Sequence, residues 1–246
     1  MVRTQGLTKR FGGFTAVRNL DLSIRRGTIH ALIGPNGAGK TTVFNLLTKF
    51  LPPTGGKIFF DGEDITALGA AEVARRGMVR SFQISAVFPH LTVRENLRIA
   101  LQRATGLTYR FWLGESSLSR LDERIDALLD STGLAEFHAG TAADLSYGRK
   151  RMLEIATTLA LAPQVMLLDE PMSGLGQEDI ARVAGLIRAA SAGRTVVMVE
   201  HNLSVVKSLS DRITVLARGE VLAEGVYDEV AANPDVIKAY LGAGDD

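Results

Sequence analysis

Residues 34–41 read Gly34-Pro35-Asn36-Gly37-Ala38-Gly39-Lys40-Thr41, which is the pattern G-x-x-x-x-G-K-T. Residues 28–33, directly before it, are apolar and β-branched, as in a buried strand. After it, apolar residues recur three and four positions apart, as on one face of a helix: Val43, Leu46, Leu47, Phe50 and Leu51. A glycine-rich loop between a strand and a helix turns backbone N–H groups and the positive helix end toward an anion. The stretch therefore predicts a loop that binds the phosphates of a nucleotide.

Each polar residue of this loop has an expected partner in a bound nucleoside triphosphate. The Lys40 ammonium would reach the β- and γ-phosphates, and the Thr41 hydroxyl would hold Mg²⁺. A glycine-rich turn that matches the pattern by chance is the alternative, and the flanking strand and helix argue against it. The residues assigned to ATP binding here are Gly34, Pro35, Asn36, Gly37, Ala38, Gly39, Lys40, Thr41 and Thr42.

The composition excludes several other classes of protein. A net charge of +1 over 246 residues argues against a surface built for nucleic acid. With no cysteine there is no disulfide, no thiolate metal site and no cysteine nucleophile. The first residues lack the apolar core of a signal peptide, and no run reaches the roughly 18 apolar residues of a membrane-spanning helix. We therefore expect a soluble or peripheral protein of the cytosol.

The order of predicted elements favours an α/β fold. Short β-type pieces and turns alternate in residues 2–34, which predicts an antiparallel β subdomain at the N-terminus. Further strands are expected at 57–60, 78–82, 165–169 and 195–199, and helices at 148–162, 178–192 and 202–209. This alternation predicts a mostly parallel sheet with helices on both faces, the core of a P-loop (RecA-like) ATPase.

Residues 84–147 have a different, helical character. Thr92-Val93-Arg94-Glu95 is a capping box, and the helix that it opens has apolar residues at Val93, Leu97 and Leu101. A second helix is expected around Leu121. The sequence therefore predicts an inserted helical subdomain at 84–147, within a nucleotide-binding core made of residues 1–83 and 148–246.

Two further segments carry candidate site residues. The apolar run Val165–Leu168 ends in Asp169 and Glu170, which would help to hold Mg²⁺ and orient the attacking water, respectively. A solvated strand end is the alternative. Ser146 is a good N-cap, so that the helix it opens would offer a second anion-binding end with the Gly148 amide. An ordinary helix cap is the alternative there.

Together these segments resemble the nucleotide-binding subunits of ABC transporters. The matching segments, in the family's order and spacing, are the phosphate loop, Gln83, Leu145-Ser146-Tyr147-Gly148-Arg149, Leu167-Leu168-Asp169-Glu170-Pro171 and His201. The resemblance covers essentially the whole chain. It implies that two ATPase subunits pair head to tail, each ATP lying between one subunit's phosphate loop and the other's signature segment.

The resemblance also implies individual roles. Phe11 would stack on adenine, although a place in the core and a shared role with Phe14 are alternatives. Gln83 would contact Mg²⁺ and the attacking water and sense the membrane partner. Glu170 would be the catalytic glutamate, and His201 the histidine at the γ-phosphate; a purely structural histidine is the alternative.

The signature segment matches the family with departures. Ser146 and Gly148 would touch the γ-phosphate of the ATP held by the opposite subunit. Tyr147 and Arg149 replace the glycine and glutamine of the commonest pattern, and Gly176 stands where Asp or Asn is common. Tyrosine at this position is usual in the ATPases of branched-chain amino-acid importers, whereas Arg149 leaves the polar contact of its position open.

Several local matches look like the larger of the two ATPase subunits of branched-chain amino-acid importers: residues 80–83, 88–97, 145–156 and 239–242. That resemblance implies a subunit on the cytoplasmic face of the inner membrane, paired with itself or a related ATPase. It also implies two permease subunits and, indirectly, an extracytoplasmic solute-binding protein. Urea, amide and lipopolysaccharide transport ATPases are near relatives.

Two other classes remain as alternatives. One is a soluble ABC-type protein that uses ATP-driven dimerisation on ribosomes, DNA or iron–sulfur scaffolds. The ribosomal kind usually carries two such halves in one chain with a charged linker, whereas this chain has one half. The DNA-repair kind carries a long coiled coil, and no sustained heptads appear here. A P-loop kinase or GTPase outside the family would leave residues 146–148 and His201 without a role.

Overall fold

The computed structural model describes residues 1–81, 87–104 and 115–241. The chain forms two compact units. The first comprises Met1–Met78, Gln164–Pro171 and Ser191–Asp246, and the second Val79–Pro163 and Met172–Ala190. The second unit extends beyond the predicted insertion at 84–147, because residues 147–160 pack against the helices of that insertion and residues 177–190 pack against residues 147–160. The functional boundary at 84–147 stays a prediction, and Gln83 lies outside the described residues.

An antiparallel sheet at the N-terminus of the first unit confirms that part of the predicted fold. Its strands follow the order β2-β1-β5-β6, and β3 pairs with β1. They are β1 (Val2–Phe11), β2 (Phe14–Leu20), β3 (Ser23–Ile24), β5 (Gly55–Phe60) and β6 (Glu63–Asp64). Along β1, residues Val2, Thr4 and Leu7 are buried while their neighbours are more exposed, so one face of the sheet covers the core.

The second sheet has the order β11-β10-β4-β9-β8-β7 and is mostly parallel. Its strands are β4 (Ile29–Ile33), β7 (Met78–Arg80), β8 (Val165–Asp169), β9 (Thr195–Val199), β10 (Arg212–Ala217) and β11 (Glu220–Gly225). Every residue of β4, β8 and β9 is buried, as parallel strands covered on both faces require.

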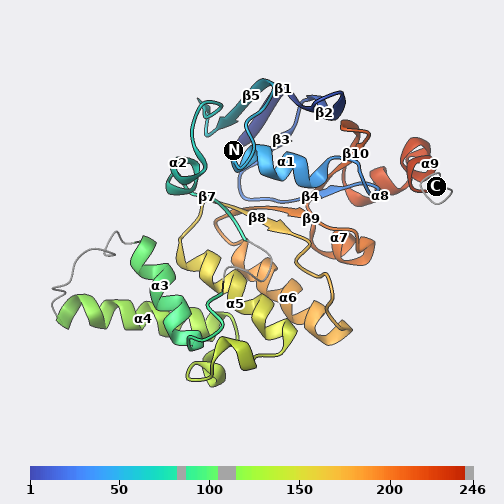
Figure 1. The fold of residues 1–246 in the computed structure, drawn as a ribbon. Coiled ribbons are helices and arrows are strands. Elements are labelled where there is room, and N and C mark those ends of the chain that lie inside the picture. Colours follow the sequence, from blue (N-terminus) through green and yellow to red (C-terminus); the bar gives the residue numbers. More distant parts are fainter. Residues whose placement is uncertain (82–86, 105–114, 242–246) are drawn as a thin grey trace. The chain divides into compact units, whose positions relative to one another are not determined.

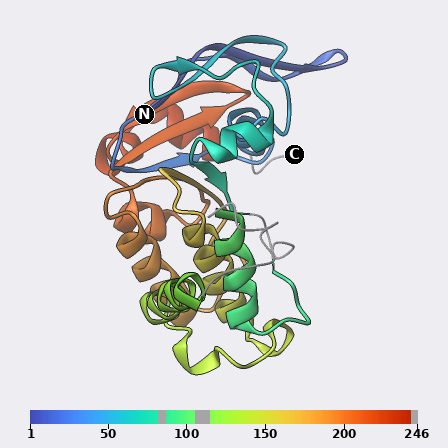
Figure 2. The same cartoon turned by 90° about the vertical axis from the view of Figure 1, so that its left-hand side faces the viewer.

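A hairpin closes one edge of this sheet. Arg218 and Gly219, which join β10 to β11, have φ of 52° and 81°, values that a tight two-residue hairpin turn requires. Figure 2 shows the two strands as neighbouring red-orange arrows. The predicted hairpin at these two residues is confirmed.

The core of the first unit gathers side chains from both sheets and from helix α1 (Lys40–Leu47), which buries Val43, Phe44, Leu46 and Leu47. The predicted continuation of this helix to Leu51 is wrong. Thr48 caps the helix, Lys49 has a φ of 61°, and Phe50 is exposed. The two prolines after Leu51 disfavour a further helical turn. The other helices of this unit are α2 (Ala70–Arg75), α7 (Leu203–Leu209), α8 (Tyr227–Ala231) and α9 (Pro234–Leu241).

The second unit is helical (Figure 1). Its helices are α3 (Val93–Ala104), α4 (Glu115–Ser131), α5 (Tyr147–Ala160) and α6 (Gln177–Ala190), with 3-10 turns η2 (Ala135–Phe137) and η3 (Ala142–Asp144). α3 packs against α4 and α5, and α5 packs against α6. The predicted apolar face of α3 is buried at Val93, Leu97 and Leu101.

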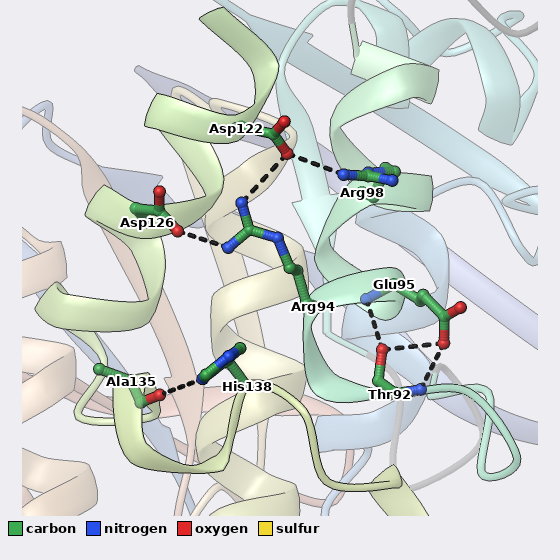
Figure 3. A network of polar contacts seen from close by, with 8 residues as sticks. All are labelled: Thr92, Arg94, Glu95, Arg98, Asp122, Asp126, Ala135 and His138. Carbon is green, nitrogen blue, oxygen red and sulfur yellow. Dashed lines mark hydrogen bonds and ion pairs between the residues drawn. The ribbon is translucent and has the colours of Figure 1, made fainter. Parts of the chain in front are cut away.

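Polar contacts fix the start of α3 and join it to α4 (Figure 3). The Thr92 hydroxyl accepts from the Glu95 N–H at 3.1 Å, and Glu95 accepts from the Thr92 N–H at 2.7 Å, which confirms the predicted capping box. The hydrogen bonds that the Thr92 N–H and hydroxyl donate to the Glu95 carboxylate lower the pKa of that carboxyl. Arg94 pairs with Asp122 and Asp126 across the two helices. Among the described residues, no helix is long and apolar enough to cross a membrane.

Candidate functional site

The glycine loop connects β4 to α1, as its sequence predicts. Gly34 and Gly39 have φ of 148° and 100°. A Cβ atom on Gly34 would lie 2.2 Å from the Leu216 carbonyl oxygen, and one on Gly39 would lie 2.6 Å from the Ala16 carbonyl oxygen. Both positions therefore require glycine, because neighbouring backbone approaches the loop closely. Within the loop Ala38 is buried, whereas Asn36 and Gly37 are exposed at its tip.

Lys40 opens α1 and lies over the loop. Its ammonium donates hydrogen bonds to the carbonyl oxygens of Gly34 at 2.6 Å and of Pro35 at 2.9 Å. Burial lowers the pKa of Lys40, and the carboxylates of Glu170 and Asp169 oppose this shift. Thr41 is exposed beside it, and Thr42 is half-buried. The loop thus combines a cation with the N-terminus of a helix, an arrangement that suits a polyphosphate.

Two carboxylates lie at the end of β8. Asp169 is buried, and Glu170 follows it with a φ of 45° while donating its N–H to the Val199 carbonyl at 2.9 Å. A non-glycine residue in this region costs on the order of 1 kcal/mol, which is common where a site dictates the direction of a side chain. The Glu170 carboxylate lies 3.9 Å from Nδ1 of His201, which follows the adjacent strand β9. The parallel strand ends thus bring together the predicted glutamate and histidine.

Glu200, which was not predicted as a site residue, shapes the loop that carries His201. Glu200 is buried, and its Oε2 accepts the N–H groups of His201 at 3.2 Å and Asn202 at 3.4 Å. Asn202 in turn caps α7, because its side-chain oxygen accepts the N–H groups of Ser204 and Val205. His201 is therefore exposed on a loop that is fixed at its base. A carboxylate directly after the apolar run Val196–Val199 was the available signal.

Phe11 lies at the tip of the hairpin formed by β1 and β2, where it pairs with Phe14. Both rings are exposed, so the alternative that Phe11 belongs to the core is wrong. The Lys9 ammonium lies 5.2 Å from the centre of the Phe11 ring. An exposed aromatic face of this kind can stack on a base, and the stacking role of Phe11 stays a prediction.

The signature segment Leu145–Arg149 belongs to the second unit and opens α5. Ser146 is its N-cap, as predicted, and accepts the N–H of Arg149 at 3.4 Å. Leu145 is buried, Tyr147 is exposed and Gly148 is buried. The guanidinium carbon of Arg149 lies 4.0 Å from the centre of the Phe137 ring, so this unusual arginine is used in a cation–π contact within its own unit.

The predicted site residues thus fall into three groups. The first unit holds Phe11, the glycine loop, Asp169, Glu170 and His201, and the second holds residues 145–149. Gln83 is outside the described residues, so its predicted contacts stay predictions. The described residues contain no cluster of three or more His, Cys, Asp or Glu side chains that could hold a metal ion. The Thr41 hydroxyl and the Asp169 carboxylate are oxygen donors, which suits Mg²⁺ held mainly by phosphates and water.

Two family models match the chain. The model described as ABC transporter matches residues 17–173, and the model described as branched-chain amino acid ATP-binding cassette transporter matches residues 220–246. Among curated proteins, the high-affinity branched-chain amino acid transport ATP-binding protein BraF of Pseudomonas aeruginosa is 40% identical over 250 residues, which cover 98% of each chain.

Solved structures match over nearly the same length. An ATP-binding cassette of an ABC transporter, solved in its ADP conformation, is 27% identical with a TM-score of 0.84, and the match covers 98% of each chain. A bacterial ABC transporter cassette solved as a dimer is 27% identical with a TM-score of 0.78, over 92% of this chain and 99% of the other.

Proposed function

The chain belongs to the ABC transporter family and is an ATPase of that family, and from this premise we propose that it powers the uptake of branched-chain amino acids. The arrangement of Lys40, Glu170 and His201 around the glycine loop of the first unit supports ATP hydrolysis, and the relatives named for branched-chain amino acid transport support the solute.

We assign phosphate binding to residues 34–42. The loop N–H groups and the N-terminus of α1 would surround the β- and γ-phosphates of ATP, and Lys40 would exchange its two loop carbonyls for phosphate oxygens. Phe11 would stack on the adenine from the first sheet. Thr41, Asp169 and Gln83 would hold Mg²⁺, which neutralises charge on the phosphates when bound.

We assign hydrolysis to Glu170, assisted by His201. The Glu170 carboxylate would accept a proton from the attacking water and hold it in line with the γ-phosphorus, while Lys40 keeps the phosphates in place. The unusual backbone of Glu170 and its bond to Val199 fix the direction of this side chain. His201 lies 3.9 Å from the same carboxylate and would bind the γ-phosphate.

Pairing with a second ATPase follows from the signature segment. Ser146 and Gly148 open a helix whose N-terminus suits the γ-phosphate of an ATP held by another subunit. The related cassette that was solved as a dimer supports a paired state for this chain. The partner is a second copy of this chain or a related ATPase subunit.

The membrane partner would bind the segment before α3. Phe88 is 52% exposed and therefore does not belong to the core. Asn96 fixes this segment: its Oδ1 accepts the Phe88 N–H at 2.8 Å, and its Nδ2 donates to the Phe88 carbonyl at 3.1 Å. A large apolar side chain presented on a fixed loop suits a protein partner. We propose that the two permease subunits dock here, with the ATPase on the cytoplasmic face of the membrane and a solute-binding protein on the other side.

The proposed solute comes from the relatives, because the solute-binding residues belong to other chains. BraF is named for branched-chain amino acid transport, and the description of the family model that matches residues 220–246 names the same class of solute. Urea or amide uptake and lipopolysaccharide export are the alternatives for a chain of this kind. A non-transport role is less well supported, since the matches include transport ATPases over nearly the whole chain.

The test is uptake by the complex of this ATPase with its co-purifying membrane subunits and solute-binding protein, reconstituted in vesicles. We expect ATP-dependent accumulation of radiolabelled leucine, with little accumulation of urea, and its loss in the Glu170→Gln variant. ATP-dependent accumulation of urea alone would contradict the solute. A complex that moves no solute although it hydrolyses ATP would contradict the transport role.

A further inference from the structure

An acidic side chain lies against the signature glycine in the second unit. A Cβ atom built on Gly148 would be 2.3 Å from Oδ2 and 2.6 Å from Oδ1 of Asp179. Gly148 is the second residue of α5, and Asp179 is in the first turn of α6, which packs against α5. The Asp179 carboxylate therefore fills the space that any side chain at position 148 would need, and this contact explains why Gly148 is buried.

The same two segments meet at a second point. A Cβ atom on Gly174, whose φ is 75°, would lie 3.2 Å from Cε1 of the Tyr147 ring. Two neighbouring residues of α5 thus contact the segment that follows Glu170. The Tyr147 ring lies against Gly174, and Gly148 lies against the Asp179 carboxylate. The start of α5 and the start of α6 are held in register by two neighbouring contacts.

Asp179 shares its cation with a neighbour. The Arg182 guanidinium forms ion pairs with two carboxylates, that of Asp179 at 3.2 Å and that of Glu178. Glu178 is 79% exposed, whereas Asp179 is 29% exposed because it faces Gly148. Both acids occupy the first turn of α6, where its helix dipole favours negative charge. Only Asp179 also lies at the start of α5, so the two acids form a natural comparison.

A carboxylate beside the start of a helix weakens the attraction of that start for a phosphate, because both groups are anions. They also repel one another at short range. A phosphate that reaches the Gly148 amide must therefore bind close to the Asp179 charge. We propose that the negative charge of Asp179 lowers the affinity of the signature segment for the nucleotide of the opposite subunit. It raises the MgATP concentration at which the nucleotide of the opposite subunit engages α5, and Arg182 weakens that effect. This inference rests on the proposed function, in which Gly148 faces that nucleotide.

The experiment measures ATP hydrolysis against MgATP concentration in the intact complex, purified with its membrane subunits. Asp179→Asn keeps the shape over Gly148 and removes the charge. We expect KM for MgATP to fall roughly fivefold, a change that corresponds to about 1 kcal/mol, with kcat within about twofold of wild type. Added salt should reduce this difference, because Asp179 is partly exposed.

Glu178→Gln is the matched control. It removes the same charge from the same turn of α6 and frees the same arginine without altering the contact with Gly148. Its KM should stay within about twofold of wild type. Arg182→Gln should change KM in the opposite direction, raising it about twofold or more, because the Asp179 charge is then less neutralised. This second variant tests the proposal even when Asp179→Asn does not assemble.

The outcomes separate the inference from the proposed function. An active wild-type complex in which Asp179→Asn has an unchanged or higher KM, or in which Glu178→Gln lowers KM equally, overturns the inference alone. A KM for Arg182→Gln that is unchanged or lower also overturns it. A correctly assembled wild-type complex that hydrolyses no MgATP overturns the proposed function, and the inference falls with it.

Discussion

The helices α1 and α5 each begin at a segment that suits an anion, and the two segments are built in opposite ways. At α1, a lysine lies over a glycine loop, and the first turn of this fully described helix carries no acid. At α5, the serine cap is accompanied by a carboxylate from α6, which lies against Gly148. The first segment places the Lys40 ammonium over its loop, whereas the second has the Asp179 carboxylate beside Gly148, together with the cations Arg149 and Lys150 of its own first turn.

This difference separates two kinds of phosphate recognition. A loop with a lysine and closely packed backbone can bind a nucleotide within one chain. A helix start with an acid beside it attracts phosphate less strongly, so binding there depends more on other contacts. We therefore expect removal of the charge at the start of α1 to weaken nucleotide binding strongly, and removal of the Asp179 charge beside α5 to change the MgATP concentration at which two subunits cooperate.

Lys40→Ala should have the largest effect. Two charge-assisted contacts to the phosphates are lost, so the affinity for MgATP should fall by a factor on the order of 10². Calorimetry on the purified chain measures it, and Lys57→Ala, at an exposed lysine of the same unit, is the control. An unchanged affinity of the Lys40→Ala variant for MgATP would contradict the role of Lys40 in phosphate binding.

Acid should destabilise the unit that carries the phosphate loop, through His30 in β4. Burial lowers the pKa of His30 from 6.5 to about 4, with Glu224 raising it and Arg212 lowering it. The unfolded chain therefore binds more protons than the folded chain between these values, and stability is lost as the pH falls from about 6.5 toward 4.

For this single group the loss amounts to about 2 kcal/mol between pH 7 and pH 5. Urea unfolding at both pH values measures it, and His30→Gln should show a correspondingly weaker pH dependence. The His30 Nε2 lies 2.8 Å from the Thr214 hydroxyl, a contact that glutamine can replace. Equal pH dependence in both proteins would contradict the assignment.

Phe88→Asp should separate recognition by the second unit from catalysis by the first. Because Phe88 is 52% exposed, its replacement should leave the thermal midpoint within a few degrees of wild type, yet reduce recovery with the membrane subunits at least about tenfold. Phe50→Asp is the matched control, since Phe50 is 51% exposed in the first unit. A strongly lowered midpoint together with normal membrane recovery would remove Phe88 from the docking role.

Arg149→Gln should have the smallest effect, and it tests whether Arg149 contacts Phe137 or nucleotide. It restores the commoner residue but removes the cation–π contact with Phe137, which is worth about 0.5–1 kcal/mol at a partly exposed site. We expect a small loss of stability in urea unfolding and little change in MgATP affinity. A pronounced fall in affinity would instead assign Arg149 a contact with nucleotide.

The fold could be predicted in most of its parts because its signals are local. Apolar runs marked the buried strands β4, β8 and β9, and the capping box at Thr92 marked the start of α3. The end of α1 was misjudged because the apolar spacing continues to Leu51, whereas the backbone turns at Lys49. The extent of the helical unit depends on tertiary packing, which no local pattern records.

The site was predictable where sequence spacing reflects a loop or a strand end, as for Lys40, Glu170 and His201. Glu200 and Asp179 were missed because each acts through a contact that the sequence does not display. Glu200 is buried under the loop that it organises, and Asp179 meets Gly148 from a different helix. A glycine can mark a loop, but its sequence position does not reveal which side chain fills the space beside it.

The separation of hydrolysis by Glu170 from phosphate binding by the glycine loop is tested most directly in the complex carrying Glu170→Gln. Its ATP turnover is measured together with its bound nucleotide. We expect hydrolysis to fall by a factor on the order of 10² or more while MgATP still binds, because the base is lost and the phosphate loop with Lys40 remains. Turnover close to that of the wild type, with nucleotide bound normally, would contradict it.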